Sequence, residues 1–120
     1  MIVQSRHELE GFRANDGCWI QELLHPRTLG QKAGFSLAHA EVDVGQSTYR
    51  HRLEQVEAYY ILAGEGCMYI ADETRTVSEG DAVIIPAQAE QWIENAGTEP
   101  LRFIAVVCPP WTAEGDERLS

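Results

Sequence analysis

The chain has 120 residues, enough for one domain with a core of its own and too few for two ordinary domains. Nine Lys and Arg residues against nineteen Asp and Glu residues give a net charge of -10, which repels nucleic-acid phosphates and anionic membrane surfaces. We therefore expect a small-molecule or protein partner, with no nucleic acid and no membrane.

The N-terminal residues MIVQSRHELEGF lack the apolar run of a secretory signal, and no segment approaches the roughly 20 apolar residues that cross a bilayer. We therefore predict a cytoplasmic protein. Cys18, Cys67 and Cys108 are widely spaced and form no CxxC pair, so neither a disulfide framework nor a thiolate zinc site is indicated. We expect all three to be buried as small hydrophobic residues.

Short runs of Val, Ile, Tyr and Phe alternate with turn residues from Phe35 onward, at intervals of about ten residues. This pattern predicts an all-β sandwich or barrel. We expect one strand at residues 18–23 and seven more at residues 36–44, 58–63, 67–71, 73–78, 82–86, 90–94 and 101–108. Asp72 and Glu73 are placed at the tip of a hairpin. The polar residues 111–120 are expected to be loosely held.

Alternate residues between Gly45 and Gly64 share one face wherever this segment is extended, because successive side chains of a strand point to opposite sides. That face contains His51, Leu53, Gln55, Glu57, Tyr59 and Ile61. Buried polar groups need partners, so a histidine and a glutamate on this face indicate a pocket. A closed barrel of this size holds either packed side chains or one small ligand.

Two spaced motifs in this region resemble those of the cupins, small β-barrels of the jelly-roll type. The first family motif spaces two glycines, two histidines and a glutamate, and its positions here hold Gly45, His51, Leu53, Glu57 and Gly64. The positions of the second motif hold Gly80, Pro86, Gln88, Gln91 and Asn95. The resemblance implies a single jelly-roll (double-stranded β-helix) barrel over residues 35–110. Residues 1–34 then form an N-terminal extension whose strand joins the barrel, and residues 111–120 form a tail.

The resemblance also implies a divalent metal ion inside the barrel. Carried over position by position, its ligands here are His51, Glu57 and Gln91, while Leu53 replaces a histidine that typical cupins use. An imidazole nitrogen, a carboxylate and an amide oxygen can coordinate Zn, Fe, Mn or Ni, with waters completing the shell. In the alternative, Gln91 and His51 both donate to Glu57 in a polar network without metal. The sequence leaves both interpretations open.

Tyr59 follows Glu57 on the same face, and some lyase-type cupins use a tyrosine in this place as a base. The resemblance therefore makes Tyr59 and Glu57 the candidate catalytic residues. A tyrosine here more often packs the barrel, and that interpretation is preferred. His39 and Glu41 alternate with small apolar residues of the preceding strand. They either line the pocket or, more simply, face solvent.

Outward-facing aromatic residues suggest contact with another layer or subunit. Tyr60 lies on the opposite face from Tyr59 and is expected to pack against such a partner. Four further residues supply apolar area that a small barrel can bury in a homodimer: Trp19, Trp92, Ile93 and Trp111. His7 and His25 are expected at the surface.

We therefore expect a metal-binding pocket that acts on a small oxygenated organic molecule, by isomerase, cyclase, lyase or dioxygenase type chemistry. The alternative is a non-catalytic binding or regulatory cupin with a degenerate metal site. Leu53 favours the alternative, because it removes a ligand. Glu57, Gln91 and Asn95 oppose it, because a decayed site has little reason to keep polar side chains facing a core.

Overall fold

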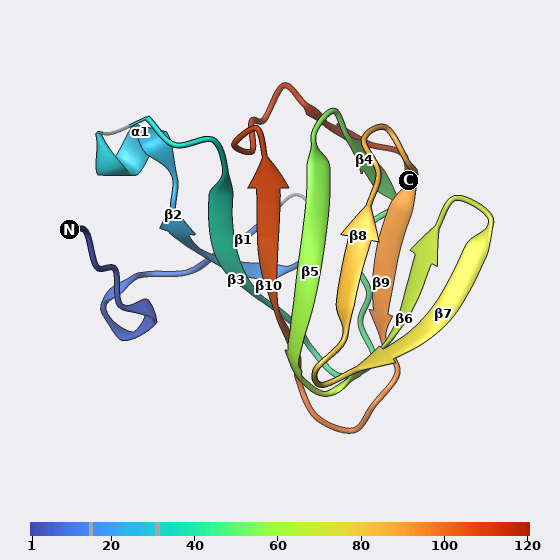
Figure 1. Cartoon of the computed structure of the whole chain (residues 1–120). Helices are drawn as coiled ribbons and strands as arrows, with labels where there is room; N and C mark the ends of the chain where they lie inside the picture. Colours follow the sequence, from blue (N-terminus) through green and yellow to red (C-terminus); the bar gives the residue numbers. More distant parts are fainter. Residues whose placement is uncertain (15, 31) are drawn as a thin grey trace.

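The computed structural model describes residues 1–14, 16–30 and 32–120 as two facing antiparallel sheets (Figure 1). In order across the six-stranded sheet are β1 (Phe12–Arg13), β2 (Trp19–Leu24), β3 (Ser36–Val42), β10 (Leu101–Cys108), β5 (Val56–Ala63) and β8 (Ala82–Ile85). In order across the five-stranded sheet are β11 (Asp116–Arg118), β4 (His51–Leu53), β9 (Gln91–Asn95), β6 (Glu65–Ile70) and β7 (Glu73–Ser78). This arrangement confirms the predicted all-β jelly roll.

Helical structure is short. It consists of a 3-10 turn, η1 (Arg6–Glu8), and one turn of α-helix, α1 (Pro26–Leu29). Within the parts of the chain that the structure describes, no helix has the length and apolar composition needed to cross a membrane.

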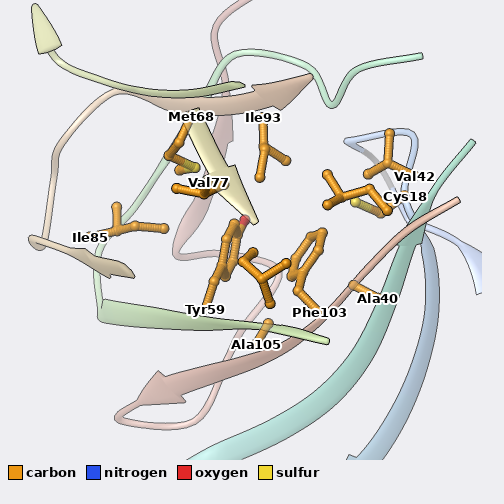
Figure 2. Close-up of a cluster of buried hydrophobic side chains, with 12 residues drawn as sticks. Cys18, Ala40, Val42, Tyr59, Met68, Val77, Ile85, Ile93, Phe103 and Ala105 are labelled. Atoms are coloured by element: carbon orange, nitrogen blue, oxygen red, sulfur yellow. The ribbon is translucent and has the colours of Figure 1, made fainter. Parts of the chain in front are cut away.

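The core lies between the two sheets and draws residues from both (Figure 2). Tyr59 of β5 packs beside Phe103 of β10, with ring centroids 4.3 Å apart. Facing them from the other sheet are Met68 and Ile93. In β10, buried Leu101, Phe103, Ala105 and Val107 alternate with more exposed residues. Burying each large apolar side chain contributes about 1.5–3 kcal/mol, so this alternation fixes which face of the strand points inward.

The last glycine of the first motif forms the tight turn between β5 and β6. Gly64 has φ +87°, a left-handed conformation that favours glycine. A Cβ at this position would lie 2.9 Å from the carbonyl oxygen of Pro100. Gly64 therefore lets the chain turn from β5 into β6 directly beside the start of β10. The predicted hairpin is present between β6 and β7, but its tip is Ala71 and Asp72, because Glu73 already pairs with Ile70.

Three expectations for the fold were wrong. The tail is not loosely held, because β11 pairs with β4 through Asp116 and Leu53 and buries Gly115. The short strand β4 itself was missed, since its three residues are too few to show alternation on their own. Of the three cysteines, Cys18 is buried, whereas Cys67 is half-buried and Cys108 is exposed.

Candidate functional site

A cavity of about 240 Å³ opens inside the barrel, beside the apolar core. Its wall includes His51 and Leu53 from β4 and Glu57 from β5, which are three of the residues predicted to share the inward face. Strands of both sheets therefore contribute to it. One water needs about 10–15 Å³ of such space, so the cavity is large enough for a small organic ligand.

His51 is held in one orientation. Its Nδ1 lies 2.9 Å from the carbonyl oxygen of Tyr49. A carbonyl only accepts, so Nδ1 carries the proton and the Nε2 of the neutral ring keeps a lone pair. The side chain is only 4% exposed. A histidine fixed in this way through one nitrogen is the usual arrangement of a metal ligand.

Glu57 is a buried carboxyl group with an unused oxygen. The residue is 7% exposed, and its Oε1 has no hydrogen-bond partner. Burial raises the pKa of Glu57 from 4.5 to about 8; the Gln91 amide opposes this shift, and the nearby Asp16 and Asp116 add to it. An acid this deeply buried and incompletely bonded is costly, so its place on a cavity wall indicates a ligand site.

Gln91 lies across from His51, because the two residues are register partners of β9 and β4. The Tyr59 hydroxyl donates to Gln91 Oε1 over 3.3 Å. The amide nitrogen is close enough to Glu57 to lower the pKa of that carboxyl, yet it makes no hydrogen bond of ordinary geometry. The expected network around Glu57 is therefore incomplete, since His51 donates to Tyr49 instead.

Tyr59 sits at the edge of the site and belongs to the core. Figure 2 shows its ring packed beside Phe103. Burial raises the pKa of Tyr59 well above 10, and the neighbouring Glu57 raises it further. A raised pKa disfavours the phenolate that a base requires.

The donor set around the cavity fits a divalent ion only if an amide takes part. Among the described residues, no three His, Cys, Asp or Glu side chains lie close enough together to hold a metal. His51 and Glu57 are two donors of the right chemistry, and Gln91 is the neighbouring third. Leu53, 2% exposed, fills the wall at the position where the resemblance implied another histidine.

The second-motif residues outside the ligand set have structural roles. Gln88, which stands in a glycine position of the motif, has φ +68° and donates its backbone N–H to the carbonyl of Leu53. The Asn95 side chain is buried and donates to the carbonyls of Val42 and Glu99, so it ties loops together and does not face the cavity. Its retention is therefore no sign of an active pocket, contrary to the sequence argument.

His39 and Glu41 do not line the cavity, because they lie on the outward side of β3. The sequence nevertheless missed that His39 is buried, at 5% exposed. Its register partner Gln21 donates to the carbonyls of Arg6 and Leu9, which holds the N-terminal segment over this side of the sheet. Burial lowers the pKa of His39, and Arg6 lowers it further.

The structure also differs from the sequence predictions at His25 and Ile93. His25 is buried, with Nε2 2.8 Å from the Trp111 carbonyl oxygen. Ile93 belongs to the core. Trp92 does point outward, where it stacks on Tyr69 with centroids 4.4 Å apart.

Sequence reasoning also missed most of the remaining cavity wall, including two acidic residues and a tryptophan. Asp16 comes from the loop before β2, Trp111 from the loop after β10, and Asp116 from β11. The Trp111 indole N–H donates to Asp116 Oδ2 over 3.1 Å. All three lie outside the two motifs, in segments without strand periodicity, so no sequence signal placed them near His51.

The sequence profile of the cupin domain matches residues 38–107. An uncharacterised protein of Methanocaldococcus jannaschii is 37% identical over 121 residues, covering 98% of this chain and 95% of that protein. The oxalate-binding protein of Thermotoga maritima is 30% identical over 89 residues, 73% of each chain. The structure of the polyketide cyclase RemF from Streptomyces resistomycificus superposes with a TM-score of 0.83 at 20% identity, covering 100% of this chain and 86% of RemF.

Proposed function

This chain belongs to the cupin family, and we propose that its barrel cavity binds a divalent metal ion and acts on a small oxygenated organic molecule. One observation carries the proposal. The fixed ring of His51 and the unpaired carboxylate oxygen of Glu57 lie on the wall of the same 240 Å³ cavity. A histidine ring fixed through its other nitrogen, beside a buried carboxyl oxygen without a partner, favours a bound cation over a dry core.

His51 Nε2, the Glu57 carboxylate and Gln91 Oε1 would hold the ion. Gln91 presents its oxygen if the amide turns over, and the Tyr59 hydroxyl then accepts from the amide nitrogen, since a hydroxyl serves both roles. When bound, the ion supplies Lewis-acid polarisation of a carbonyl or enol oxygen. Tyr59 positions the amide, and the Tyr49 carbonyl keeps the His51 ring in place. Zn, Fe, Mn and Ni are the candidate ions.

Other properties of the cavity residues affect the protonation of Glu57 and the access of water. With a pKa of about 8, Glu57 is largely protonated at neutral pH in the metal-free protein. Ion binding displaces that proton, so occupancy becomes pH-dependent. Leu53 and Val107 give the cavity apolar walls that exclude water from a bound ligand. Isomerase, cyclase, lyase or dioxygenase type chemistry remains the proposed range of reactions.

A non-catalytic binding role is the second candidate. Leu53 removes one of the usual ligands, which leaves a metal site of lower affinity. The Thermotoga maritima relative is named for binding oxalate, which favours capture without turnover. The two roles separate experimentally, because a binding protein returns its ligand unchanged.

Elemental analysis of the purified protein tests the proposal. Wild type should carry close to one divalent ion per chain, and His51→Ala, Glu57→Ala and Gln91→Ala should lose it. Glu54→Ala, which changes an exposed glutamate in the same segment, is the matched control and should keep the ion. Absence of metal from wild type, even after reconstitution, would refute the metal site. Incubating the loaded protein with carbonyl and enol compounds then distinguishes turnover from binding.

The proposal includes a homodimer in the cytoplasm. Tyr60 of β5 and Ile84 of β8 are 50% and 70% exposed on the outward side of the six-stranded sheet. Adjacent exposed apolar side chains on a flat sheet face are typical of contact surfaces, and a second copy would cover them.

A further inference from the structure

Two carboxylates on the cavity wall have no part in the metal site. Asp16 Oδ1 accepts from the backbone N–H of Cys18 at 3.0 Å, and Asp116 Oδ2 accepts from the Trp111 indole at 3.1 Å. These bonds fix each carboxyl group and use one of its oxygens. Both residues line the same cavity as Glu57.

Two basic residues lie on the same wall: His51 is near enough to lower the pKa of Asp116, and Arg13 is paired elsewhere. Arg13 lines the cavity, but its guanidinium binds Asp43 at 3.0 Å and the carbonyl of Gly17 at 3.3 Å. Glu22, also on the wall, is already paired with Arg27 at 2.6 Å. Acidic side chains therefore outnumber basic ones on the wall, and Asp16 and Asp116 are the two acids outside both the metal site and the pair with Arg27.

These acids influence one another across the cavity. Burial raises the pKa of Asp116 and Asp16 adds to the shift, while His51 and the hydrogen bond from Trp111 oppose it. Like charges held together in a partly buried space disfavour ionisation, and a cation placed among them relieves the repulsion. Glu57, 93% buried by its 7% exposure and with Oε1 unpartnered, shows that the space is built for an occupant.

Aromatic rings complete this part of the wall. Trp111 and Phe12 line the cavity, and the bond to Asp116 fixes the indole. Carboxylates beside an aromatic face favour an organic ammonium group, which gains charge-assisted hydrogen bonds from the acids and cation–π attraction from the ring.

We propose that the cavity selects ligands with a positively charged amino group, bound by Asp16 and Asp116 beside the Trp111 ring. This inference rests on the proposed function, because it names the substrate class of the same cavity. The amino group occupies the acidic side, and the oxygenated part of the molecule extends toward His51 and Glu57. Dicarboxylates of the same size are repelled by these acids.

Four linear probes with a four-carbon chain test the charge preference: putrescine, 4-aminobutanoate, 1,4-butanediol and succinate. Their affinities are measured by titration calorimetry on protein freed of metal and, separately, on protein loaded with zinc. In the metal-free protein, putrescine should bind at least tenfold more tightly than butanediol, and succinate should not bind. The metal-free form is decisive, since a bound ion attracts carboxylates by itself.

Asp16→Asn and Asp116→Asn test the residues. Asparagine keeps an oxygen for the Cys18 and Trp111 donors, so both variants should melt like wild type while losing at least tenfold in affinity for putrescine. Glu114→Gln removes the same charge from an exposed position near Asp116 and should bind putrescine normally. This control separates local recognition from the attraction of amines to a chain of net charge -10.

The outcomes separate this inference from the proposed function. Putrescine binding without any metal retention supports the amino-group site and refutes the metal site. Metal retention with equal affinity for succinate and putrescine in the metal-free protein overturns the amino-group site alone. The amino-group site is also overturned if neither putrescine nor 4-aminobutanoate binds to the metal-free or the zinc-loaded protein. It is overturned as well if Asp16→Asn and Asp116→Asn both bind putrescine as wild type does.

Discussion

His51 and Tyr49 are joined by a 2.9 Å contact between the ring Nδ1 and the backbone carbonyl oxygen, which leaves the ring's Nε2 as an acceptor. The two residues flank Arg50 at the start of β4, so a two-residue step of backbone sets the orientation of a side chain in the cavity. The backbone carbonyl of Tyr49 orients the His51 ring, so no second side chain is needed for this.

Metal-free wild type should lose stability as pH rises, and Glu57→Gln should not. The folded pKa of about 8 lies above the unfolded value near 4.5, so the unfolded chain releases its proton first. The stabilisation is complete below pH 4.5 and disappears between pH 4.5 and 8. At 1.36 kcal/mol per pKa unit, wild type should lose about 3 kcal/mol more than the variant between pH 5 and 8. Urea unfolding in the presence of a chelator measures this; equal slopes would contradict it.

Tyr59→Phe should reduce the stability of the metal-free protein. It removes the hydroxyl that donates to Gln91, so a buried amide oxygen loses its partner at a cost of about 1–2 kcal/mol. Tyr60→Phe changes an exposed tyrosine on the outward face and should shift stability by less than about 0.5 kcal/mol. Denaturant unfolding compares the two. A loss of turnover of a hundredfold or more, with stability preserved, would instead assign Tyr59 as the base.

Gln88→Gly should stabilise the protein. Gln88 has φ +68°, a conformation that costs a residue with a Cβ about 1 kcal/mol. Glycine relieves that strain but loses about 0.5–1 kcal/mol through its greater freedom in the unfolded chain, so the expected net gain is up to about 0.5 kcal/mol. Ala87→Gly, at the preceding residue, is the control and should destabilise by about 0.5–1 kcal/mol. Thermal melting of both variants is the measurement, and a lower melting temperature for Gln88→Gly would count against the strain argument.

The wild-type protein should be a dimer, and Ile84→Glu should be a monomer. Ile84 is 70% exposed beside Tyr60 on the outward face of the six-stranded sheet, where a buried glutamate in each copy would oppose association. Val44→Glu changes another exposed apolar residue, in the turn after β3, and should leave the dimer intact. Light scattering after size exclusion gives the masses. A monomeric wild type, or a dimer that tolerates both changes, would place the interface elsewhere or remove it.

The strands and the inward face of the first motif were predictable because they depend on local periodicity. Alternation from His51 to Ile61 is a property of consecutive residues, and the structure buries each alternate side chain of that run. The change from one sheet to the other within this run was not visible in the sequence. His51 lies on β4 in one sheet and Glu57 on β5 in the other, so the two meet because the chain changes sheets between them.

The positions of Asp116 and His39 were not predicted for a different reason. Asp116 reaches the cavity because β11 pairs with β4, a contact between segments about sixty residues apart in the sequence. His39 is buried because the N-terminal segment crosses the outside of the sheet, held by Gln21. Neither event leaves a periodic pattern near the residue itself. Contacts between distant segments determine the positions of Asp116 and His39. A single sequence indicates such contacts only where a known motif spans the segments.

The strand β11 is short and lies at the edge of its sheet, yet it carries a wall of the cavity. Short edge strands open locally at low free-energy cost, so the backbone amides of residues 116–118 should exchange with deuterium sooner than those of β10. A ligand that touches Asp116 would hold this strand closed. Slower deuterium uptake at the end of the chain therefore provides a readout of cavity occupancy that requires no knowledge of the reaction.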